Sequence, residues 1–174
     1  MRLLNGRAQS VGVWTLLAMA RNRYGISSEA AFNLSHSGDY VLCSVDMDEN
    51  PGTKAGCDIE AVNGQNLKVA KRFFCPSEYT EIMRQETKEK QSDTFCRFWV
   101  LKESFMKATR KGMALSMSSF EIELGNPPVL TRKPEEFADS YYYREYNIND
   151  IPYKIAVCST DAHIEGEIQM EFKL

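Results

Sequence analysis

A long helix with a wide apolar face constrains the fold of this chain more than any other feature. Hydrophobic side chains recur at helical spacing from Asp93 to Arg110, and Gly112 then provides a stop signal. Two adjacent rows along this stretch are apolar except for one charged residue each: the first is Cys96, Trp99, Glu103 and Met106, and the second is Phe95, Phe98, Lys102 and Phe105. Because such a helix has to be covered over much of its surface, we expect it to lie inside a packed core.

The two charged residues on this face, Lys102 and Glu103, restrict what the core contains. Burying a lone carboxylate costs several kcal/mol, so Glu103 is expected to be protonated, paired or bound to a metal ion. An internal ion pair between a lysine and a glutamate is the alternative to a metal site.

The rest of the chain predicts an α+β fold. Strand candidates are residues 40–46, 54–62, 120–124, 141–146, 153–158 and 164–172. Strong turn chemistry at residues 48–52 predicts a hairpin between the first two of these strands. Short turns between strands imply antiparallel pairing, with the helices packed on one face.

Three further helices are expected. The first covers residues 8–24, and its predicted buried face is Val11, Trp14, Leu17 and Ala18. The second covers residues 67–74, and the third follows Ser77, which is a good N-cap. The pair Asn63-Gly64 breaks the chain, so we predict two lobes, residues 1–63 and 64–174.

Composition excludes several classes of protein. The formal net charge of −3 gives no general indication of nucleic-acid binding, so a phosphate-bearing ligand would need a local basic patch. The five cysteines are odd in number and lack C-x-x-C spacing, which argues against a disulfide framework or a zinc site and predicts a cytoplasmic protein.

The apolar run at residues 11–17, followed by Ala18-Met19-Ala20, has some features of a signal peptide. Arg21 and Arg23 follow at once, and the run is too short to span a bilayer. We therefore expect a buried helix and no membrane partner.

The segment Gly56-Cys57-Asp58-Ile59-Glu60 combines a strand pattern with two acids. Because side chains alternate across a strand, Asp58 and Glu60 project together while Cys57 and Ile59 face a core. Two carboxylates on one face raise each other's pKa unless a cation lies between them. A solvated outer face is the alternative interpretation.

Together with the helical Glu103, these acids have the chemistry of a magnesium site. Magnesium prefers hard oxygen ligands, commonly a few carboxylates completed by phosphate oxygens and water. Asp58, Glu60 and Glu103 meet this requirement if the strand and the helix face each other. Lys107, one turn beyond Glu103, could then reach a phosphate.

A third polar group, FNLSHSG at residues 32–38, is expected to form a loop before the first strand. Ser35, His36 and Gly38 can donate hydrogen bonds to a phosphate or a base, although turn chemistry and a surface histidine explain the pattern equally well. A Ser–His hydrolase is disfavoured because no G-x-S-x-G motif is present and adjacent side chains diverge. His163 is interpreted as a surface residue.

These motifs, in this order, resemble the 4′-phosphopantetheinyl transferases, specifically the larger surfactin-synthetase-activating type. They are FNLSHSG at 32–38, GCDIE at 56–60 and RFWVLKESFMKATRKG at 97–112, with KRFFCPSEY at 71–79 similar to the family's intervening segment. The resemblance implies two pseudo-symmetric α+β lobes, each an antiparallel sheet packed with helices, with coenzyme A in the cleft between them. It further implies a magnesium-dependent holo-[acyl-carrier-protein] synthase, which transfers the 4′-phosphopantetheine arm to a serine of an acyl or peptidyl carrier protein and releases 3′,5′-ADP.

The resemblance also assigns roles to single residues. The matched metal ligands are Asp58, Glu60 and Glu103. Lys107 matches the lysine that contacts the pyrophosphate, while Ser35 and His36 match a loop that holds the nucleotide end. Glu103, or a water molecule that it orients, is the candidate base for the serine proton. Lys102 is expected to support Glu103.

The similarity begins within the family's first lobe, so this lobe is expected to be shortened and to lack several basic contacts to the nucleotide. Arg2 is the candidate for one of them. Residues 61–74 resemble the carrier-binding surface, with Gln65 and Lys68 as contact candidates. A non-catalytic relative that binds coenzyme A or a carrier protein is the second hypothesis. The sequence does not decide between monomer and dimer.

Overall fold

The computed structural model describes residues 2–63, 67–148 and 151–170. Its helices are α1 (Arg2–Tyr24), α2 (Leu67–Phe73), α3 (Pro76–Met83) and α4 (Lys88–Ala108), followed by two short 3-10 helices, η1 (Gly112–Ala114) and η2 (Met117–Ser119). Its strands are β1 (Phe32–Ser37), β2 (Tyr40–Val45), β3 (Ala55–Ala61), β4 (Glu121–Glu123), β5 (Val129–Arg132), β6 (Tyr142–Tyr146) and β7 (Tyr153–Ser159). Every strand pair is antiparallel, which confirms the predicted α+β class.

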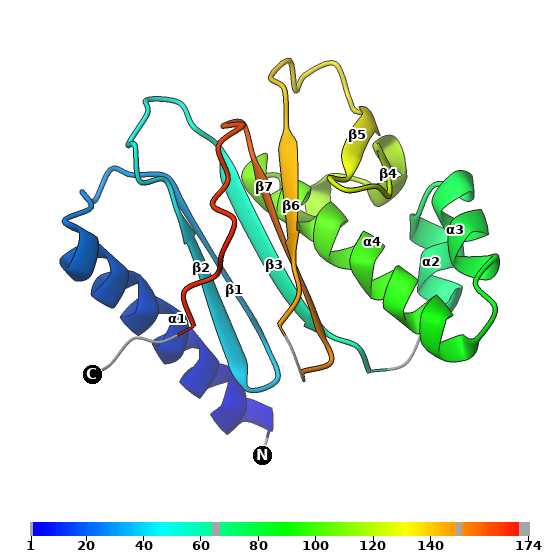
Figure 1. The fold of residues 1–174 in the computed structure, drawn as a ribbon, viewed down its shortest axis with the longest axis horizontal. Coiled ribbons are helices and arrows are strands. Elements are labelled where there is room, and N and C mark those ends of the chain that lie inside the picture. Colours follow the sequence, from blue (N-terminus) through cyan, green and yellow to red (C-terminus); the bar gives the residue numbers. More distant parts are fainter. Residues whose placement is uncertain (1, 64–66, 149–150, 171–174) are drawn as a thin grey trace.

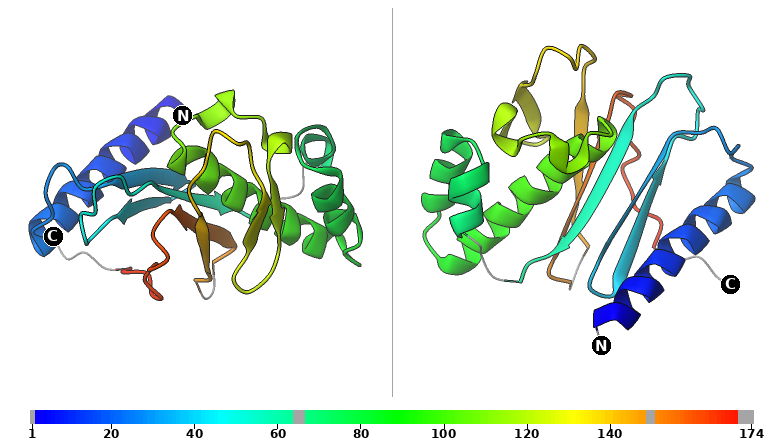
Figure 2. Two further views of the ribbon diagram at one scale, coloured as in Figure 1. Left: turned by 90° about the horizontal axis from the view of Figure 1, so that it is seen from above. Right: turned by 180° about the vertical axis from the view of Figure 1, so that it is seen from behind.

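The strands lie in the order β2-β1-β3-β7-β6, and α1 and α4 cover the same side of this layer (Figures 1 and 2). The predicted hairpin between residues 40–46 and 54–62 is wrong, because β2 pairs with β1 whereas β3 pairs with β7. Gly38 has a φ of 54°, which permits the tight turn from β1 to β2. The expected turn after β2 does form, since Oδ1 of Asp46 accepts a hydrogen bond from the N–H of Asp48, but it directs the chain into another sheet.

Residues 32–38 were expected to form a loop, but residues 32–37 form strand β1 instead. Their polar side chains serve as pairing groups for the adjacent edge of β3. The N–H groups of Cys57, Ile59 and Ala61 donate, respectively, to Asn33 Oδ1 at 3.1 Å, Ser35 Oγ at 3.4 Å and Ser37 Oγ at 3.2 Å. We call Asn33, Ser35 and Ser37 the polar ladder. It satisfies N–H groups of β3 that the pairing with β7 leaves unpaired.

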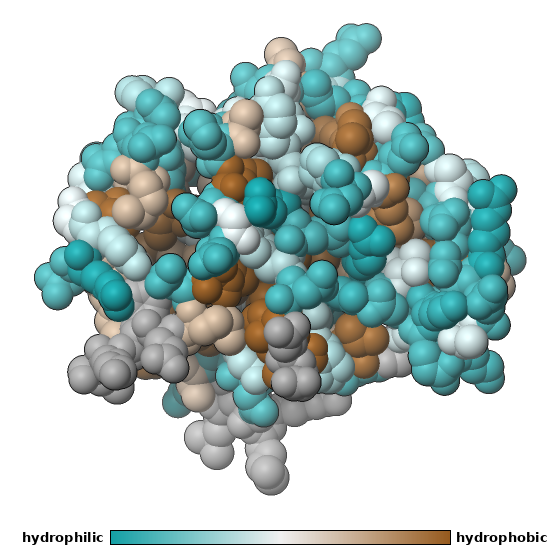
Figure 3. All heavy atoms as spheres, viewed as in Figure 1, coloured by the Kyte–Doolittle hydropathy of each residue, from teal (hydrophilic) through white to brown (hydrophobic). Residues whose placement is uncertain are grey.

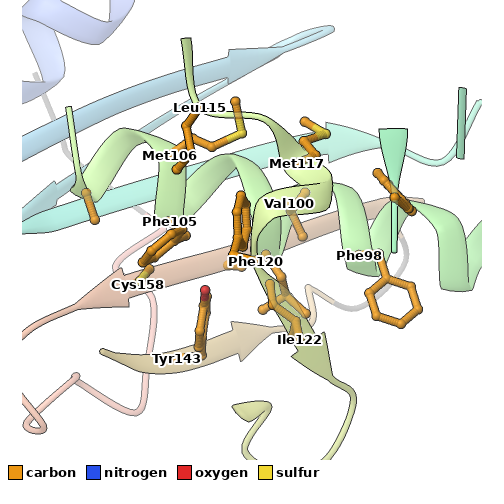
Figure 4. Packing of buried hydrophobic residues seen from close by; sticks show 14 of the residues in the cluster. Phe98, Val100, Phe105, Met106, Leu115, Met117, Phe120, Ile122, Tyr143 and Cys158 are labelled. Atoms are coloured by element: carbon orange, nitrogen blue, oxygen red, sulfur yellow. The ribbon is translucent and has the colours of Figure 1, made fainter. Parts of the chain in front are cut away.

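The hydrophobic core lies between α4 and the β3-β7-β6 sheet, as the helix pattern predicted. Figure 4 shows Phe105 of α4 close to Phe120, with Tyr143 of β6 pointing toward them. The ring centroids of Phe105 and Phe120 are 4.7 Å apart, and both side chains are fully buried. Helix α4 begins earlier than expected because Thr87 caps its N-terminus by accepting a hydrogen bond from the N–H of Lys90.

Helix α1 packs with a different face from the one predicted. Of the four residues predicted to be buried, Leu17 is buried, whereas Val11, Trp14 and Ala18 are exposed. Val13 and Ala20 are buried together with Leu17. Both sets have helical spacing, so periodicity alone did not identify the side that meets β2.

For α3, the N-cap is Cys75 rather than Ser77, because Pro76 occupies the first helical position and the Glu78 carboxylate accepts from the Cys75 N–H at 2.9 Å.

The strand expected over residues 164–172 does not form in its described part, residues 164–170; the rest of that range lies outside the described residues. As far as residue 170 the segment after β7 is irregular and crosses the strand layer on the side opposite α4 (Figures 1 and 2). It contacts β6 through, among others, a hydrogen bond from Tyr146 Oη to the Glu165 carbonyl, 2.7 Å long. Figure 3 shows hydrophobic side chains gathered near this crossing and a hydrophilic surface over α3.

The division into lobes 1–63 and 64–174 stays a prediction, and β3 joins β7 across that boundary. In the described part of the chain, no helix has the length and apolar character needed to cross a bilayer.

Candidate active site

Helix α4 approaches strand β3 closely because residue 56 is glycine. A Cβ atom placed on Gly56 would lie 2.0 Å from the Ser104 carbonyl oxygen and 2.4 Å from the Ala108 nitrogen. The side chain of Asp58 points to the same side of β3 as the Gly56 position, so the close approach sets α4 directly over the acidic residues. The strand and the helix therefore face each other, which is the condition that the expected magnesium site required.

The contact at the centre of this interface is an ion pair. Nζ of Lys107 lies 2.7 Å from Oδ1 of Asp58, 2.9 Å from Ser35 Oγ and 3.0 Å from the Cys57 carbonyl oxygen. An ammonium group has three N–H donors, and these contacts use all of them. Three separate elements, β1, β3 and α4, thus contribute to one polar cluster.

Asp58 is almost fully buried and only half satisfied. Its Oδ1 accepts from Ser35 and Lys107, whereas the buried Oδ2 has no hydrogen-bond partner among the described residues. Burial raises the pKa of Asp58, and Lys107 and Ser35 oppose the rise. An unpaired buried carboxylate oxygen is costly, so Oδ2 is the atom of this site that most requires a cation or a donor.

Glu60 and Glu103 complete the acidic group. Burial, and then the charge of Asp58, raises the pKa of Glu60. Burial also raises the pKa of Glu103, with additional contributions from the charges of Asp58 and Glu60. Each acid influences the others, so the three carboxylates that the sequence singled out share one electrostatic environment.

Within residues 2–63, 67–148 and 151–170, no three acidic, histidine or cysteine side chains converge closely enough to hold a metal ion as they stand. The donor set nevertheless fits a hard divalent cation, because it comprises three carboxylates, and one of them, Asp58, has an oxygen, Oδ2, without a partner among the described residues. The Lys107 ammonium supplies positive charge at Asp58 in this arrangement. The assignment of Asp58, Glu60 and Glu103 as ligands stays a prediction.

Lys102 does not support Glu103, contrary to expectation. It forms a fully buried ion pair with Glu78 of α3, with Nζ 2.9 Å from Oε1. Nζ also donates to the carbonyl oxygens of Met117 at 2.7 Å and Phe120 at 2.9 Å. Neighbouring residues of a helix point about 100° apart, so Lys102 faces α3 and η2 while Glu103 faces β3.

The residues assigned to the nucleotide differ in accessibility. His36 is exposed on β1, whereas Ser35 is buried and engaged by Asp58 and Lys107. Arg2 belongs to α1, but its side chain lies outside the described residues, as does the whole of Gln65. These nucleotide and carrier assignments stay predictions.

Sequence reasoning missed two residues that shape the site, Gly56 and Glu78. The signal for Gly56 was a glycine in a strand opposite a helix, which often marks a close backbone approach. The signal for Glu78 was its place three residues after a helix N-cap, where an acidic side chain commonly reaches back to the cap.

Comparison with known proteins agrees with this geometry. Residues 54–158 match the family described as the 4′-phosphopantetheinyl transferase superfamily. The chain therefore belongs to this superfamily, and the matched region contains β3, α4 and the segment between them.

Individual relatives carry the same name. The chain is 34% identical over 142 residues to the 4′-phosphopantetheinyl transferase Sfp of Bacillus subtilis, covering 82% of this chain and 60% of that protein. It is 39% identical over 95 residues to the 4′-phosphopantetheinyl transferase HetI of Nostoc sp., and this match covers 53% of this chain and 38% of that protein. This chain spans about three fifths of the length of the first of these relatives.

Among solved structures, the holo-[acyl-carrier-protein] synthase of Thermotoga maritima overlaps 61% of this chain and 61% of its own, with 20% identity and a TM-score of 0.49.

Proposed function

We propose that the protein transfers the 4′-phosphopantetheine arm of coenzyme A to a serine of an acyl or peptidyl carrier protein, in a magnesium-dependent reaction that releases 3′,5′-ADP. The observation that carries the proposal is the 2.7 Å ion pair between Lys107 and Asp58, because it joins the two sequence motifs in one cluster. Membership of the transferase superfamily supports the same reaction.

Magnesium would be held by Asp58, Glu60 and Glu103, and when bound it would act as a Lewis acid toward the pyrophosphate. The electrostatic coupling of the three acids supports this assignment. Without a cation the cluster holds three carboxylates and one ammonium group, so a second positive charge is favoured there.

Lys107 would stabilise the charge that develops on the phosphate oxygens when the carrier serine attacks the β-phosphorus. The Lys107 side chain as a whole is 25% exposed, so part of it meets the solvent. Because all three of its N–H groups are already used, contact with a phosphate requires it to exchange one protein partner for the substrate oxygen.

Glu103 is the candidate general base for the serine hydroxyl. A base is most effective when its pKa is close to the working pH, and burial together with Asp58 raises the pKa of Glu103 toward that range. Its place within α4, more than a turn before the helix ends at Ala108, holds it on a rigid element.

The substrates would bind on either side of this cluster. Exposed His36 at the β1–β2 hairpin is the candidate contact to the nucleotide end of coenzyme A. Helix α2 exposes Lys68, Lys71 and Arg72, which suit a carrier protein with negative charge at its surface. All five cysteines are free, which supports a cytoplasmic setting.

A direct test is to incubate the protein with coenzyme A, magnesium and a small panel of apo carrier proteins, and to measure the mass gained by each carrier. We expect the phosphopantetheine mass on at least one carrier. Glu103→Gln is expected to reduce the rate by about 100-fold or more while circular dichroism shows an unchanged fold. The matched control is Glu123→Gln, an exposed glutamate on β4, which should keep the wild-type rate.

Full activity of Glu103→Gln would exclude the role given to Glu103. If coenzyme A binds in a calorimeter while no tested carrier gains mass, the protein is a non-catalytic binding relative instead.

A further inference from the structure

The hydroxyl group of Ser35 has no capacity left for a ligand. A serine hydroxyl has one proton and two lone pairs. The proton is directed to Asp58 Oδ1 at 2.8 Å, and the oxygen accepts from Lys107 Nζ at 2.9 Å and from the Ile59 N–H at 3.4 Å. Ser35 is also only 6% exposed. Its role therefore concerns the protein's own side chains.

These bonds determine which oxygen of Asp58 is available. Oδ1 receives both the Ser35 proton and the Lys107 ammonium, while Oδ2 remains buried and without a partner among the described residues. A carboxylate fixed through one oxygen cannot rotate freely about its terminal bond. Ser35 thus holds the carboxylate plane and leaves Oδ2 as the single open acceptor.

We propose that Ser35 is a positioning residue, which acts through Asp58 and Lys107 to present Oδ2 of Asp58 to a divalent cation. This role rests on the proposed function, and it differs from a contact between Ser35 and the nucleotide. Ser35 belongs to β1, so its hydroxyl joins the hairpin that carries His36 to the Asp58 carboxylate, in addition to the bonds that Asn33 and Ser37 make to the backbone of β3.

The neighbouring members of the polar ladder make different contacts. Asn33 bonds the backbone N–H of Cys57 through its amide oxygen, and Ser37 bonds the N–H of Ala61. A hydrogen bond from the Ser37 side chain also opposes the rise in the pKa of Glu60. In the described part of the chain, Ser35 is the member of this ladder that bonds both Asp58 and Lys107. Loss of its hydroxyl is therefore expected to affect cation binding beyond any effect on strand packing.

The test uses Mn²⁺ as the probe and the full chain without coenzyme A. Free Mn²⁺ is measured by electron paramagnetic resonance during a titration, so no enzymatic turnover is needed. We expect Ser35→Ala to weaken Mn²⁺ binding by about 10-fold or more, the usual effect of removing a group that orients a metal ligand. Ser35→Thr, which keeps the hydroxyl, should restore most of the affinity.

The matched control is Ser104→Ala. Ser104 is a buried serine of α4 whose hydroxyl bonds only the Leu101 carbonyl oxygen among the described residues, so its loss should change Mn²⁺ affinity less than twofold. A second comparison uses Asp58→Asn. If Ser35 acts through Asp58, adding Ser35→Ala to Asp58→Asn should cause no further loss.

Wild-type affinity in Ser35→Ala, or an equal further loss in the Asp58→Asn background, would overturn the proposal. If Ser35→Ala does not fold, Ser35→Cys takes its place with the same expectation, because a thiol is a weak donor of similar size. Mn²⁺ binding without transfer to any carrier would overturn the proposed function alone. Absence of Mn²⁺ binding in the wild-type protein would overturn the metal site and this proposal with it.

Discussion

Nζ of Lys107 lies 2.7 Å from Oδ1 of Asp58, so an ion pair joins helix α4 to strand β3 at the centre of the acidic cluster. The Asp58 side chain is 8% exposed and that of Lys107 is 25% exposed. The pair therefore has a structural role in the protein without a bound cation, in addition to the role proposed for Lys107 at the phosphate.

Replacing the lysine tests both roles. Lys107→Met leaves the Asp58 carboxylate buried without its counter-charge, and we expect a loss of about 1–3 kcal/mol in the free energy of unfolding. Urea unfolding with and without excess Mg²⁺ measures this free energy, and Mg²⁺ should restore part of the lost stability. Arg97→Met removes another ion pair of α4, the one with Glu145, and should not respond to Mg²⁺ in this way. An equal response of both variants would contradict the assignment.

The close approach at Gly56 gives a second prediction. In Gly56→Ala the new methyl group overlaps the Ser104 and Ala108 backbone, so α4 has to move away from β3. We expect a destabilisation of about 1–3 kcal/mol or more in thermal unfolding, together with loss of Mn²⁺ binding. Gly6→Ala is the control, because that position in α1 has open space and alanine favours a helix by about 1 kcal/mol. Unchanged Mn²⁺ affinity in Gly56→Ala would show that the contact is not needed.

The buried ion pair of Lys102 and Glu78 gives a third prediction. Lys102→Met removes the counter-charge of a fully buried carboxylate, and we expect a loss of about 3–5 kcal/mol in the free energy of unfolding. Combining it with Glu78→Gln should cost less than the sum of the single changes, with a coupling of at least about 1 kcal/mol. Urea unfolding of the four proteins checks this double-mutant cycle. Additive losses would mean that the two side chains contribute independently.

The raised pKa values of Glu60 and Glu103 give a fourth prediction. An acid with a higher pKa in the folded state takes up its proton before the unfolded chain does, so the metal-free protein gains stability as the pH falls through the folded pKa toward the ordinary value of 4.5. Saturating Mg²⁺ should reverse this trend, because protons then compete with the bound cation.

Thermal unfolding between pH 5 and 7.5, with chelator or with Mg²⁺, measures the effect against a Glu60→Gln, Glu103→Gln double variant. At neutral pH without metal, the unfolding temperature of the variant should be a few degrees higher than that of the wild type. A stabilisation of about 1 kcal/mol produces a shift of this size in a domain of this length. A parallel pH dependence of the two proteins would argue against raised pKa values for Glu60 and Glu103.

The elements with strong periodicity could be predicted from the sequence. The wide apolar face of α4 correctly indicated a central helix, and the alternation around Asp58 and Glu60 correctly placed both acids on one side of a strand. The coupling of Glu103 to these acids followed from the same patterns, because period and spacing determine which side chains share a face.

Contacts between distant segments could not be predicted in this way. Periodicity shows that Lys102 is buried, but it does not show that Glu78 of another helix is its partner. The same limit applied to β2, for which a turn-rich connection favoured β3, although the tight turn at Gly38 selected β1 instead. Most of the loop predicted at residues 32–38 is a strand, residues 32–37, because its polar side chains pair with β3, which composition does not reveal.

The pairing of β3 with β7 has a consequence for synthesis of the chain. Strand β3 ends at Ala61, whereas β7 begins only at Tyr153, so β3 leaves the ribosome several seconds before its partner at ~10 residues per second. During that interval the acidic strand lacks its antiparallel neighbour. A nascent chain that stops just before Tyr153 would already contain every proposed metal ligand and would still lack the strand that aligns two of them.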